Sequence, residues 1–228
     1  MLGEQEMAET LAAALAAGQP RRAPFPFTVF NPFPADLYAE ILANRPADEF
    51  YAPLSHRDAL RPDGTSTRLV LSLEPESVAR LPAPQREFWS AFNAVMRSRA
   101  VCEVFLRHLE PELTARFGTP VSEIPCHPTA RLGRDFDGYK ITPHPDKQRV
   151  YTAQVYLAED DALADVGTTV YERLADGRFS AVERLSFLPN TGFCFVPTER
   201  SFHGVEPISV SKPRQNLHIS CFLKPTGF

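Results

Sequence analysis

The second half of the chain, from Thr129 onward, is built from short apolar runs separated by turn residues. The segments 160–167 and 175–177 are the clearest predicted turns, because they combine aspartate, alanine and glycine between the runs. Short runs with β-branched and aromatic residues, divided at close intervals by such turns, are typical of all-β barrels and sandwiches. We therefore expect this half to form an all-β barrel.

The first half has a different pattern, with longer segments of helical character. We predict helices over 7–17 and 36–44, and the apolar residues of 85–109 also recur at helical spacing. Residues 67–73 are predicted to form a strand. The polar segment 53–65 is interpreted either as a substrate loop near the barrel mouth or as an ordinary surface connection. We expect the aromatic residues of 85–109 to pack against the sheet.

Composition limits what kind of protein this can be. The chain has 228 residues, of which 43% are hydrophobic and 17 are phenylalanine, which is enough for a sizeable core. We expect one domain over 1–228. The formal net charge is −4 without a block of lysine or arginine, so binding to nucleic acid or to an anionic membrane is not expected.

Four widely spaced cysteines give no sign of a disulfide framework, and we interpret them as buried thiols in a reducing compartment: Cys102, Cys126, Cys194 and Cys221. The alanine-rich N-terminus carries Glu4, Glu6 and Glu9 where a signal peptide requires positive charge. Apolar runs also stay shorter than a bilayer-spanning helix requires. The sequence thus predicts a soluble, cytoplasmic protein.

Three residues of the predicted barrel have the chemistry of a metal site. His144 and Asp146 stand at i and i+2, so on a strand both side chains point to one side while Pro145 faces away. His203 follows far downstream, in a segment that we expect to be a strand at the barrel mouth. Two imidazoles and one carboxylate form a facial triad, which leaves open positions on an octahedral iron ion. Zinc hydrolases accept similar ligands.

Arg214 favours iron over zinc. It begins a predicted strand that follows His203, and its planar guanidinium suits a carboxylate held by two parallel hydrogen bonds. With His144, Asp146 and His203, it makes the chain resemble the 2-oxoglutarate and Fe(II)-dependent dioxygenases, whose pattern is His-X-Asp, a distant His and a later Arg. The resemblance covers roughly 131–228, and more loosely extends back to Phe25.

The resemblance implies a double-stranded β-helix, a jelly-roll or cupin-like core, with N-terminal helices packed outside it. In this mainly β, α+β fold, residues 1–24 would form an N-terminal helix and arm, 25–128 the helical support and substrate-loop region, and 129–228 the core with the iron site. His144, Asp146 and His203 would bind Fe(II), and Arg214 would bind the distal carboxylate of the cosubstrate 2-oxoglutarate. The implied reaction consumes O2 and converts 2-oxoglutarate to succinate and CO2.

Further polar residues are candidates for the cosubstrate site. Thr152, Gln154 and Tyr156 share one face of a predicted strand, and the first two could hydrogen-bond 2-oxoglutarate. Tyr139, on the preceding strand, and Asn216, on the Arg214 face, are further candidates for cosubstrate binding. Three arginines could each anchor an anionic substrate or be ordinary surface charges: Arg68, Arg131 and Arg134. The other four histidines are excluded as metal ligands, since His218 shares the Arg214 face of its strand and the remaining three have no partner pattern: His56, His108 and His127.

The function predicted from these residues is hydroxylation of an unactivated C–H bond in a small metabolite. Desaturation, cyclisation and epoxidation remain open, as do the substrate and the oligomeric state. One alternative is a cupin-like metalloenzyme, an isomerase or a dioxygenase that does not use 2-oxoglutarate, since cupins also place histidines and carboxylates inside a barrel. Another is a barrel that uses the metal only to sense or carry a ligand.

Overall fold

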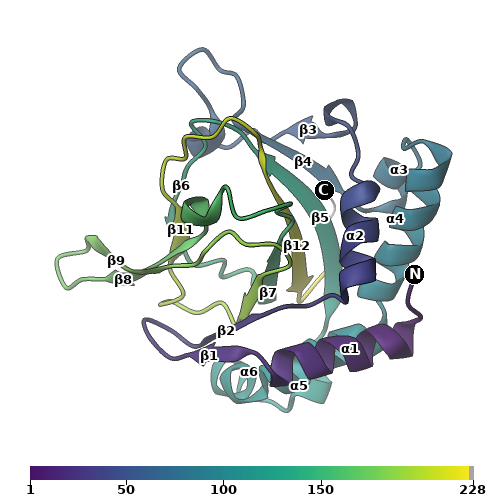
Figure 1. The fold of residues 1–228 in the computed structure, drawn as a ribbon. Coiled ribbons are helices and arrows are strands. Elements are labelled where there is room, and N and C mark those ends of the chain that lie inside the picture. Colours follow the sequence, from purple (N-terminus) through teal and green to yellow (C-terminus); the bar gives the residue numbers. More distant parts are fainter. Residues whose placement is uncertain (226–228) are drawn as a thin grey trace.

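The computed structural model describes residues 1–225 and consists of two antiparallel sheets with helices packed against one of them (Figure 1). Over these residues the larger sheet has the strand order β1-β2-β10-β7-β12-β5-β4-β3, and the smaller one has the order β6-β11-β8-β9. The helices lie on the outer side of the larger sheet, and the β8–β9 hairpin projects from the opposite side of the molecule. The barrel interior lies between the two sheets.

From β5 to β12 the strands of the barrel alternate between the sheets along the chain, except that β8 and β9 form a hairpin within the smaller sheet. Strands of the larger sheet are β5 (His127–Asp135), β7 (Arg149–Tyr156), β10 (Gly192–Phe195) and β12 (Arg214–Phe222). Strands of the smaller sheet are β6 (Ile141–His144), β8 (Thr169–Arg173), β9 (Phe179–Arg184) and β11 (His203–Val205). This alternation is the double-stranded β-helix, so the predicted fold class is confirmed.

The larger sheet is extended on both edges by strands from the first half of the chain. These are β1 (Gln19–Arg21), β2 (Phe27–Phe30), β3 (Ala52–Pro53) and β4 (Arg68–Ser72). Strand β4 pairs with β5 over Arg68↔Asp135 to Ser72↔Arg131, which confirms the strand predicted over 67–73. Because of this register, the side chain of Arg68 enters the barrel beside Asp135.

Helices from the first half cover the outer face of the larger sheet. They are α1 (Glu4–Ala16), α2 (Ala35–Ala43), α3 (Pro75–Val78), α4 (Ala83–Met96), α5 (Arg99–His108) and α6 (Glu110–Phe117). Phe92 and Phe105 from these helices share one buried cluster with Tyr151 and Val155 of β7. Burying each such side chain contributes about 1.5–3 kcal/mol, so the helices stabilise the sheet that carries the site.

The helical pattern over 85–109 is divided into two helices in the structure. Helix α4 ends at Met96, and Ser98 begins α5 by accepting a hydrogen bond from the Val101 N–H at 3.3 Å. A serine hydroxyl satisfies one of the unpaired N–H groups of a new helix, so it favours a break at this point. The short helix α3 and the helix α6 were not predicted.

The structure brings three of the cysteines together, which their wide spacing in the sequence did not predict. Cys126 lies within disulfide reach of both Cys102 and Cys221, although these partners are 24 and 95 residues away in the sequence. Helix packing brings Cys102 to the sheet, and the β5–β12 pairing brings Cys126 to Cys221. Cys194 is buried and free, as predicted.

Across residues 1–225, helices long and apolar enough to cross a membrane are absent.

Candidate metal centre

Three side chains converge where β6 and β11 lie next to each other. His144 is the last residue of β6, His203 is the first of β11, and the two are direct partners in the antiparallel register. Asp146 follows β6 immediately. Its Oδ1 lies 3.5 Å from His144 Nε2 and its Oδ2 lies 3.5 Å from His203 Nε2, and one ligand atom from each residue lies within 4.8 Å of the other two. The structure thus brings the predicted triad together.

Asp146 reaches the histidines in a way that the sequence prediction did not anticipate. It does not continue the strand, because β6 ends at His144 and Asp146 has a φ of 54°, in the left-handed region. Aspartate is one of the few residues that adopt this conformation without large strain, since its short side chain can hydrogen-bond locally. The two ligands therefore converge through a turn after the strand. The alternation of side chains along a single strand, on which the sequence prediction relied, is therefore not what brings His144 and Asp146 together.

Backbone carbonyls orient both imidazoles. His144 Nδ1 lies 3.0 Å from the Thr142 carbonyl oxygen, and His203 Nδ1 lies 3.0 Å from the Ser201 carbonyl oxygen. A carbonyl oxygen only accepts, so each Nδ1 carries the proton and donates it. The Nε2 lone pairs are then free and directed toward Asp146. In metal-binding histidines, the ring nitrogen that does not bind the metal typically donates a hydrogen bond of this kind, which fixes the ring orientation.

The charges of the triad suit a divalent cation. Burial opposes the ionisation of Asp146, but the close approach of His203 and the positive charge of Arg149 hold the pKa of its carboxyl well below the usual range. Burial and the neighbouring His203 lower the pKa of His144 to about 4, so this imidazole is neutral at pH 7. A carboxylate and a neutral imidazole are the forms that bind metal. Thr152 Oγ1 also donates to Asp146 Oδ2 at 3.1 Å.

Arg214 lines the metal cavity, but its guanidinium already has partners. Its Nη1 lies 2.5 Å from Asp135 Oδ2 and its Nη2 lies 3.2 Å from Thr168 Oγ1, while Tyr156 and Phe187 pack against its faces. Both Arg214 and Asp135 are almost fully buried. The Nε of Arg214 has no hydrogen-bond partner within residues 1–225. Arg214, the predicted carboxylate anchor, is therefore already ion-paired with Asp135, and its Nε–H group remains as a donor without a partner in the described residues.

The other predicted cosubstrate residues lie around the same cavity, with one exception. Thr152, Gln154 and Tyr139 line it, although Tyr139 lies in the turn before β6 and not on a strand. Asn216 is fully buried behind the cavity wall, where its Nδ2 donates to Asp135 Oδ2 at 3.1 Å. Gly133 makes room for it, because a Cβ there would lie 2.5 Å from Asn216 Oδ1.

Sequence reasoning missed part of the basic lining. Arg149 forms an ion pair with Asp146, and its short distance from Asp146 in the sequence was the signal that could have identified it. His218, excluded as a ligand, does line the cavity, where its Nε2 lies 2.7 Å from Arg68 Nη2. Burial lowers the pKa of His218 well below its usual value, so the neutral ring accepts from Arg68. His218 faces the arginines and is not part of the triad.

The three arginines proposed as anion anchors have different environments. Arg134 lies outside the barrel interior, 2.6 Å from Asp48. Arg68 is buried, with its Nε 3.3 Å from Asp135 Oδ1 and its Nη1 hydrogen-bonded to the Tyr139 hydroxyl. The side chain of Arg131 lines the metal cavity, and its guanidinium forms neither a hydrogen bond nor an ion pair with residues 1–225. Burial and the neighbouring Arg149 and Arg68 lower the pKa of Arg131 to about 9.

The cavity at the triad continues toward Arg131. The part that the triad lines has a volume of about 50 Å³. An adjoining cavity of about 180 Å³ shares Arg131, Arg149 and His218 with it and is also lined by Thr129, Ser220 and Phe222. Arg131 therefore stands between the metal centre and the second space.

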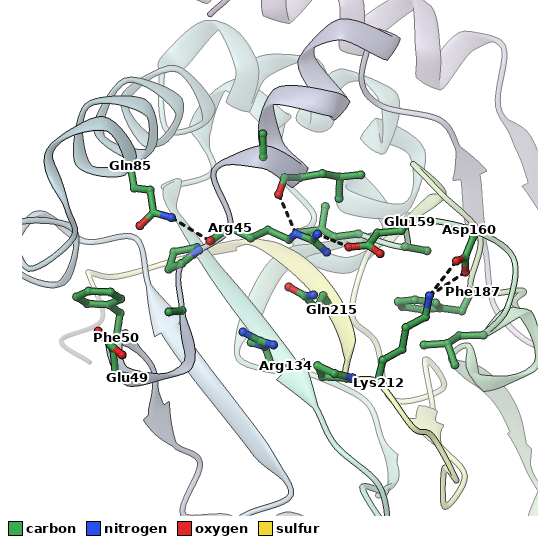
Figure 2. Close-up of a pocket in the computed structure, with 18 of the residues that line it drawn as sticks. Arg45, Glu49, Phe50, Gln85, Arg134, Glu159, Asp160, Phe187, Lys212 and Gln215 are labelled. Atoms are coloured by element: carbon green, nitrogen blue, oxygen red, sulfur yellow. Dashed lines mark hydrogen bonds and ion pairs between the residues drawn. The ribbon is translucent and has the colours of Figure 1, made fainter.

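A larger cleft of about 950 Å³ lies on the outer side of the barrel, between α2, α4 and the segment after β7 (Figure 2). Its charged lining is mostly neutralised, because Arg45 pairs with Glu159 and Lys212 lies 2.9 Å from Asp160. Phe187 lines this cleft and also packs on Arg214, so the two side chains separate it from the metal cavity. The triad does not line this cleft.

Comparisons with known proteins agree on the fold. Neither a protein-family model nor a curated protein sequence matches the chain. A prolyl-4-hydroxylase of Pseudomonas putida is 18% identical, covers 95% of this chain and 99% of that chain, and gives a TM-score of 0.51. An oxidoreductase of the 2-oxoglutarate-Fe(II) oxygenase family from Burkholderia pseudomallei is 13% identical, covers 98% and 91%, and gives a TM-score of 0.53.

A third similar structure is the dioxygenase for auxin oxidation 1 from Arabidopsis thaliana, solved in complex with 2-oxoglutarate. It is 14% identical, covers 99% of this chain and 91% of that chain, and gives a TM-score of 0.53. At these identities the likeness establishes the fold. The chain has the fold of the 2-oxoglutarate and Fe(II)-dependent oxygenases, which confirms the resemblance seen in the sequence at the level of architecture.

Proposed function

We propose that the protein is a non-haem Fe(II) and 2-oxoglutarate-dependent dioxygenase that hydroxylates an unactivated C–H bond of a small metabolite. The observation that carries this proposal is the convergence of two Nε2 lone pairs and one carboxylate at the end of β6. That donor set fits Fe(II), with His144, Asp146 and His203 as its ligands. Bound iron would supply the activation of O2, coupled to conversion of 2-oxoglutarate to succinate and CO2.

The chain's own residues would position the cosubstrate and exclude water. Arg214, with its unpaired Nε–H, is the proposed anchor of the distal carboxylate of 2-oxoglutarate. Gln154, Thr152 and Tyr139 would hydrogen-bond the cosubstrate from the cavity wall, and Asn216 would act through Asp135. Tyr156 and Phe187 shield the Arg214 guanidinium from solvent, which strengthens its interaction with an anion.

The charge balance of the cavity also supports an anionic substrate. Within residues 1–225, four arginines face the barrel interior (Arg68, Arg131, Arg149 and Arg214) and two carboxylates, Asp135 and Asp146, oppose them. This leaves a surplus of two positive charges. A ferrous ion and the two carboxylates of 2-oxoglutarate would cancel each other, so the surplus would remain. We propose that Arg131 neutralises part of it by binding a carboxylate or phosphate of the substrate.

A first experiment tests the cofactor pair. Metal-free protein is titrated anaerobically with Fe(II) and then 2-oxoglutarate, and the visible charge-transfer band of the chelated cosubstrate is recorded. We expect a band in the wild type that disappears in His144→Ala and weakens in Arg214→Ala. Metal binding without any band would rule against the dioxygenase.

One observation favours a second candidate, the cupin-like metalloenzyme that does not use 2-oxoglutarate. Arg214 already has Asp135 as a counter-charge, so a cosubstrate is not required to explain its burial. Tight 2-oxoglutarate binding that is lost in Arg214→Ala would decide for the dioxygenase. Uncoupled turnover of 2-oxoglutarate by the wild type would likewise rule against a barrel that only senses or carries a ligand.

The variants Arg131→Gln and Arg131→Lys distinguish the proposed substrate-anion site at Arg131 from the proposed 2-oxoglutarate site at Arg214. If Arg131 binds the substrate, Arg131→Gln keeps the 2-oxoglutarate band but loses coupled turnover of carboxylate- or phosphate-bearing substrates, and Arg131→Lys retains part of it. If instead the band is lost in Arg131→Gln and persists in Arg214→Ala, Arg131 anchors the cosubstrate and Arg214 has a structural role.

Partners and location complete the proposal. The net charge of −4 supports a small molecule as the partner, with no nucleic acid and no membrane. A cytoplasmic location remains part of the proposal, and cell fractionation with an antibody against the full chain tests it.

A further inference from the structure

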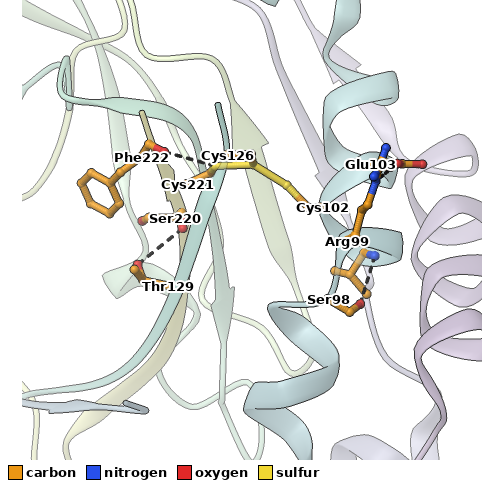
Figure 3. The surroundings of a disulfide bond; sticks show 10 residues. Ser98, Arg99, Cys102, Glu103, Cys126, Thr129, Ser220, Cys221 and Phe222 are labelled. Carbon is orange, nitrogen blue, oxygen red and sulfur yellow. Dashed lines mark hydrogen bonds and ion pairs between the residues drawn. A yellow bond between two sulfur atoms is a disulfide. The ribbon is translucent and has the colours of Figure 1, made fainter. Parts of the chain in front are cut away.

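Three cysteines from separate parts of the chain meet behind the larger sheet, away from the metal centre (Figure 3). Cys102 comes from α5, Cys126 precedes β5 by one residue, and Cys221 lies near the end of β12. The sulfur of Cys126 lies between the other two and within disulfide reach of both.

The two bridges cannot exist at once, because a cysteine sulfur that is bonded to its own Cβ has one valence left for another sulfur. They are therefore alternatives that share Cys126. The Cα atoms of Cys126 and Cys221 are 5.8 Å apart, inside the usual disulfide range, whereas those of Cys102 and Cys126 are 7.5 Å apart. Cys126–Cys221 is thus the bridge that the backbone accommodates as it stands, whereas Cys102–Cys126 requires a small backbone movement that brings the two Cα atoms closer.

A surface cavity of about 560 Å³ gives access to this cluster. Cys102 and Cys126 line it, whereas Cys221 lies behind them and is fully buried. Its charged lining within the described residues consists of Arg97, Arg99, Arg107 and Glu103, so the wall carries net positive charge. Positive charge near a thiol favours the reactive thiolate. The same charge attracts an anionic reagent and disfavours a divalent cation.

We propose that Cys102, Cys126 and Cys221 form a thiol–disulfide exchange site that reacts with an anionic low-molecular-weight disulfide of the glutathione disulfide class. The Cys126 thiolate attacks one sulfur of the reagent, the reagent's S–S bond breaks, and one thiolate leaves. The Cys221 thiolate then attacks Cys126 in the mixed disulfide and expels the second. Two cysteines are oxidised by two electrons, and the reagent is reduced to two thiols that take their protons from water.

Cys102 allows the disulfide to change partners. Its thiolate is placed to attack Cys126 Sγ, forming Cys102–Cys126 and releasing Cys221 as a thiolate, with no net oxidation. The first bridge links Cys221 of β12 to the segment before β5, while the second links α5 to that segment. The cluster can thus move one covalent bond between the sheet and the helix layer.

Alkylation and mass spectrometry test this proposal on the full-length chain. Fully reduced protein is treated with glutathione disulfide, quenched with N-ethylmaleimide in denaturant so that buried thiols also react, and mapped by peptide. We expect alkylated cysteines to fall from four to two in the wild type, with Cys126 and Cys221 bridged and Cys194 still alkylated. Cys102→Ser should form the same bridge, Cys221→Ser should form Cys102–Cys126, and Cys194→Ser, the matched control, should behave as wild type.

Three results would overturn the exchange site. One is a wild type that keeps four alkylatable thiols under these conditions. Another is rapid bridging in Cys126→Ser, which would remove the central role of that sulfur. The last is stoichiometric binding of Zn(II) by the reduced wild type that is lost in Cys102→Ser, which would make the cluster a metal site.

The reagent class is tested by rate. Glutathione disulfide, which is anionic, should oxidise the site several-fold faster than cystamine, which is cationic, and the difference should shrink at high salt. Arg99→Gln and Arg107→Gln, both at exposed positions, should reduce the preference, and the exposed Arg178→Gln should not. Faster reaction with cystamine would contradict the anionic class.

Discussion

The two faces of strand β12 bury different kinds of side chain. Toward the barrel interior stand Arg214, Asn216 and His218, which are held by Asp135 and Arg68. Toward the helices stand Leu217 and Ile219, which belong to the apolar cluster. Buried charge costs free energy even when paired, whereas apolar burial stabilises. One strand thus carries the polar site on one side and the packing that maintains it on the other.

The largest expected effect is on the interior side, at the metal ligands. His203→Ala removes one of three ligands, so Fe(II) binding should fall below detection by metal analysis after gel filtration, while far-UV circular dichroism stays unchanged. His127→Ala is the matched control and should keep the iron. Full iron binding by His203→Ala would contradict the assignment of the triad.

Asp135→Asn should destabilise the protein by about 3–5 kcal/mol, because it leaves the buried guanidinium groups of Arg68 and Arg214 without their carboxylate. Urea denaturation of the metal-free protein measures this effect. The exposed Asp161→Asn serves as the control and should change stability by less than about 0.5 kcal/mol. An unchanged midpoint for Asp135→Asn would show that the buried ion pairs contribute little.

Leu217→Ala tests the opposite face of the same strand. Its side chain is fully buried in the apolar cluster, so truncation should cost about 2–5 kcal/mol through lost burial and a residual cavity. At a temperature where the variant is folded, its Fe(II) affinity should match that of the wild type. A large loss of metal affinity would mean that the two faces are not separable.

Thr152→Val should give the smallest effect, because it removes one hydrogen bond to Asp146 while conserving side-chain shape. Losing a hydrogen bond to a metal ligand typically lowers metal affinity by about 10–100-fold. We expect the lower end of this range, since Arg149 still forms an ion pair with the Asp146 carboxylate. Competition with a coloured chelator measures the affinity. An unchanged affinity would show that Arg149 alone is sufficient.

Local sequence patterns predicted the architecture because strand and helix periodicities follow from backbone geometry. The division of β7 into a polar face with Thr152 and Gln154 and an apolar face with Tyr151 and Val155 agrees with the observed lining and core. The break at Ser98 was missed because the apolar residues have helical spacing on each side of it. The position of Asp146 in a turn was missed because β6 ends at His144, two residues earlier than the motif suggests.

The amino-acid sequence by itself determined the residue types of the triad, the alternation of faces along the strands and the position of Arg214 at the start of a strand. Only the tertiary structure decided which distant groups meet. Asp135 pairs with Arg214, Arg68 with His218, and Cys126 with Cys102 and Cys221, across separations of 24 to 150 residues. Strand register and helix packing bring these groups together. The pattern within any one segment does not specify such pairings, because it sets the direction of a side chain and not its partner.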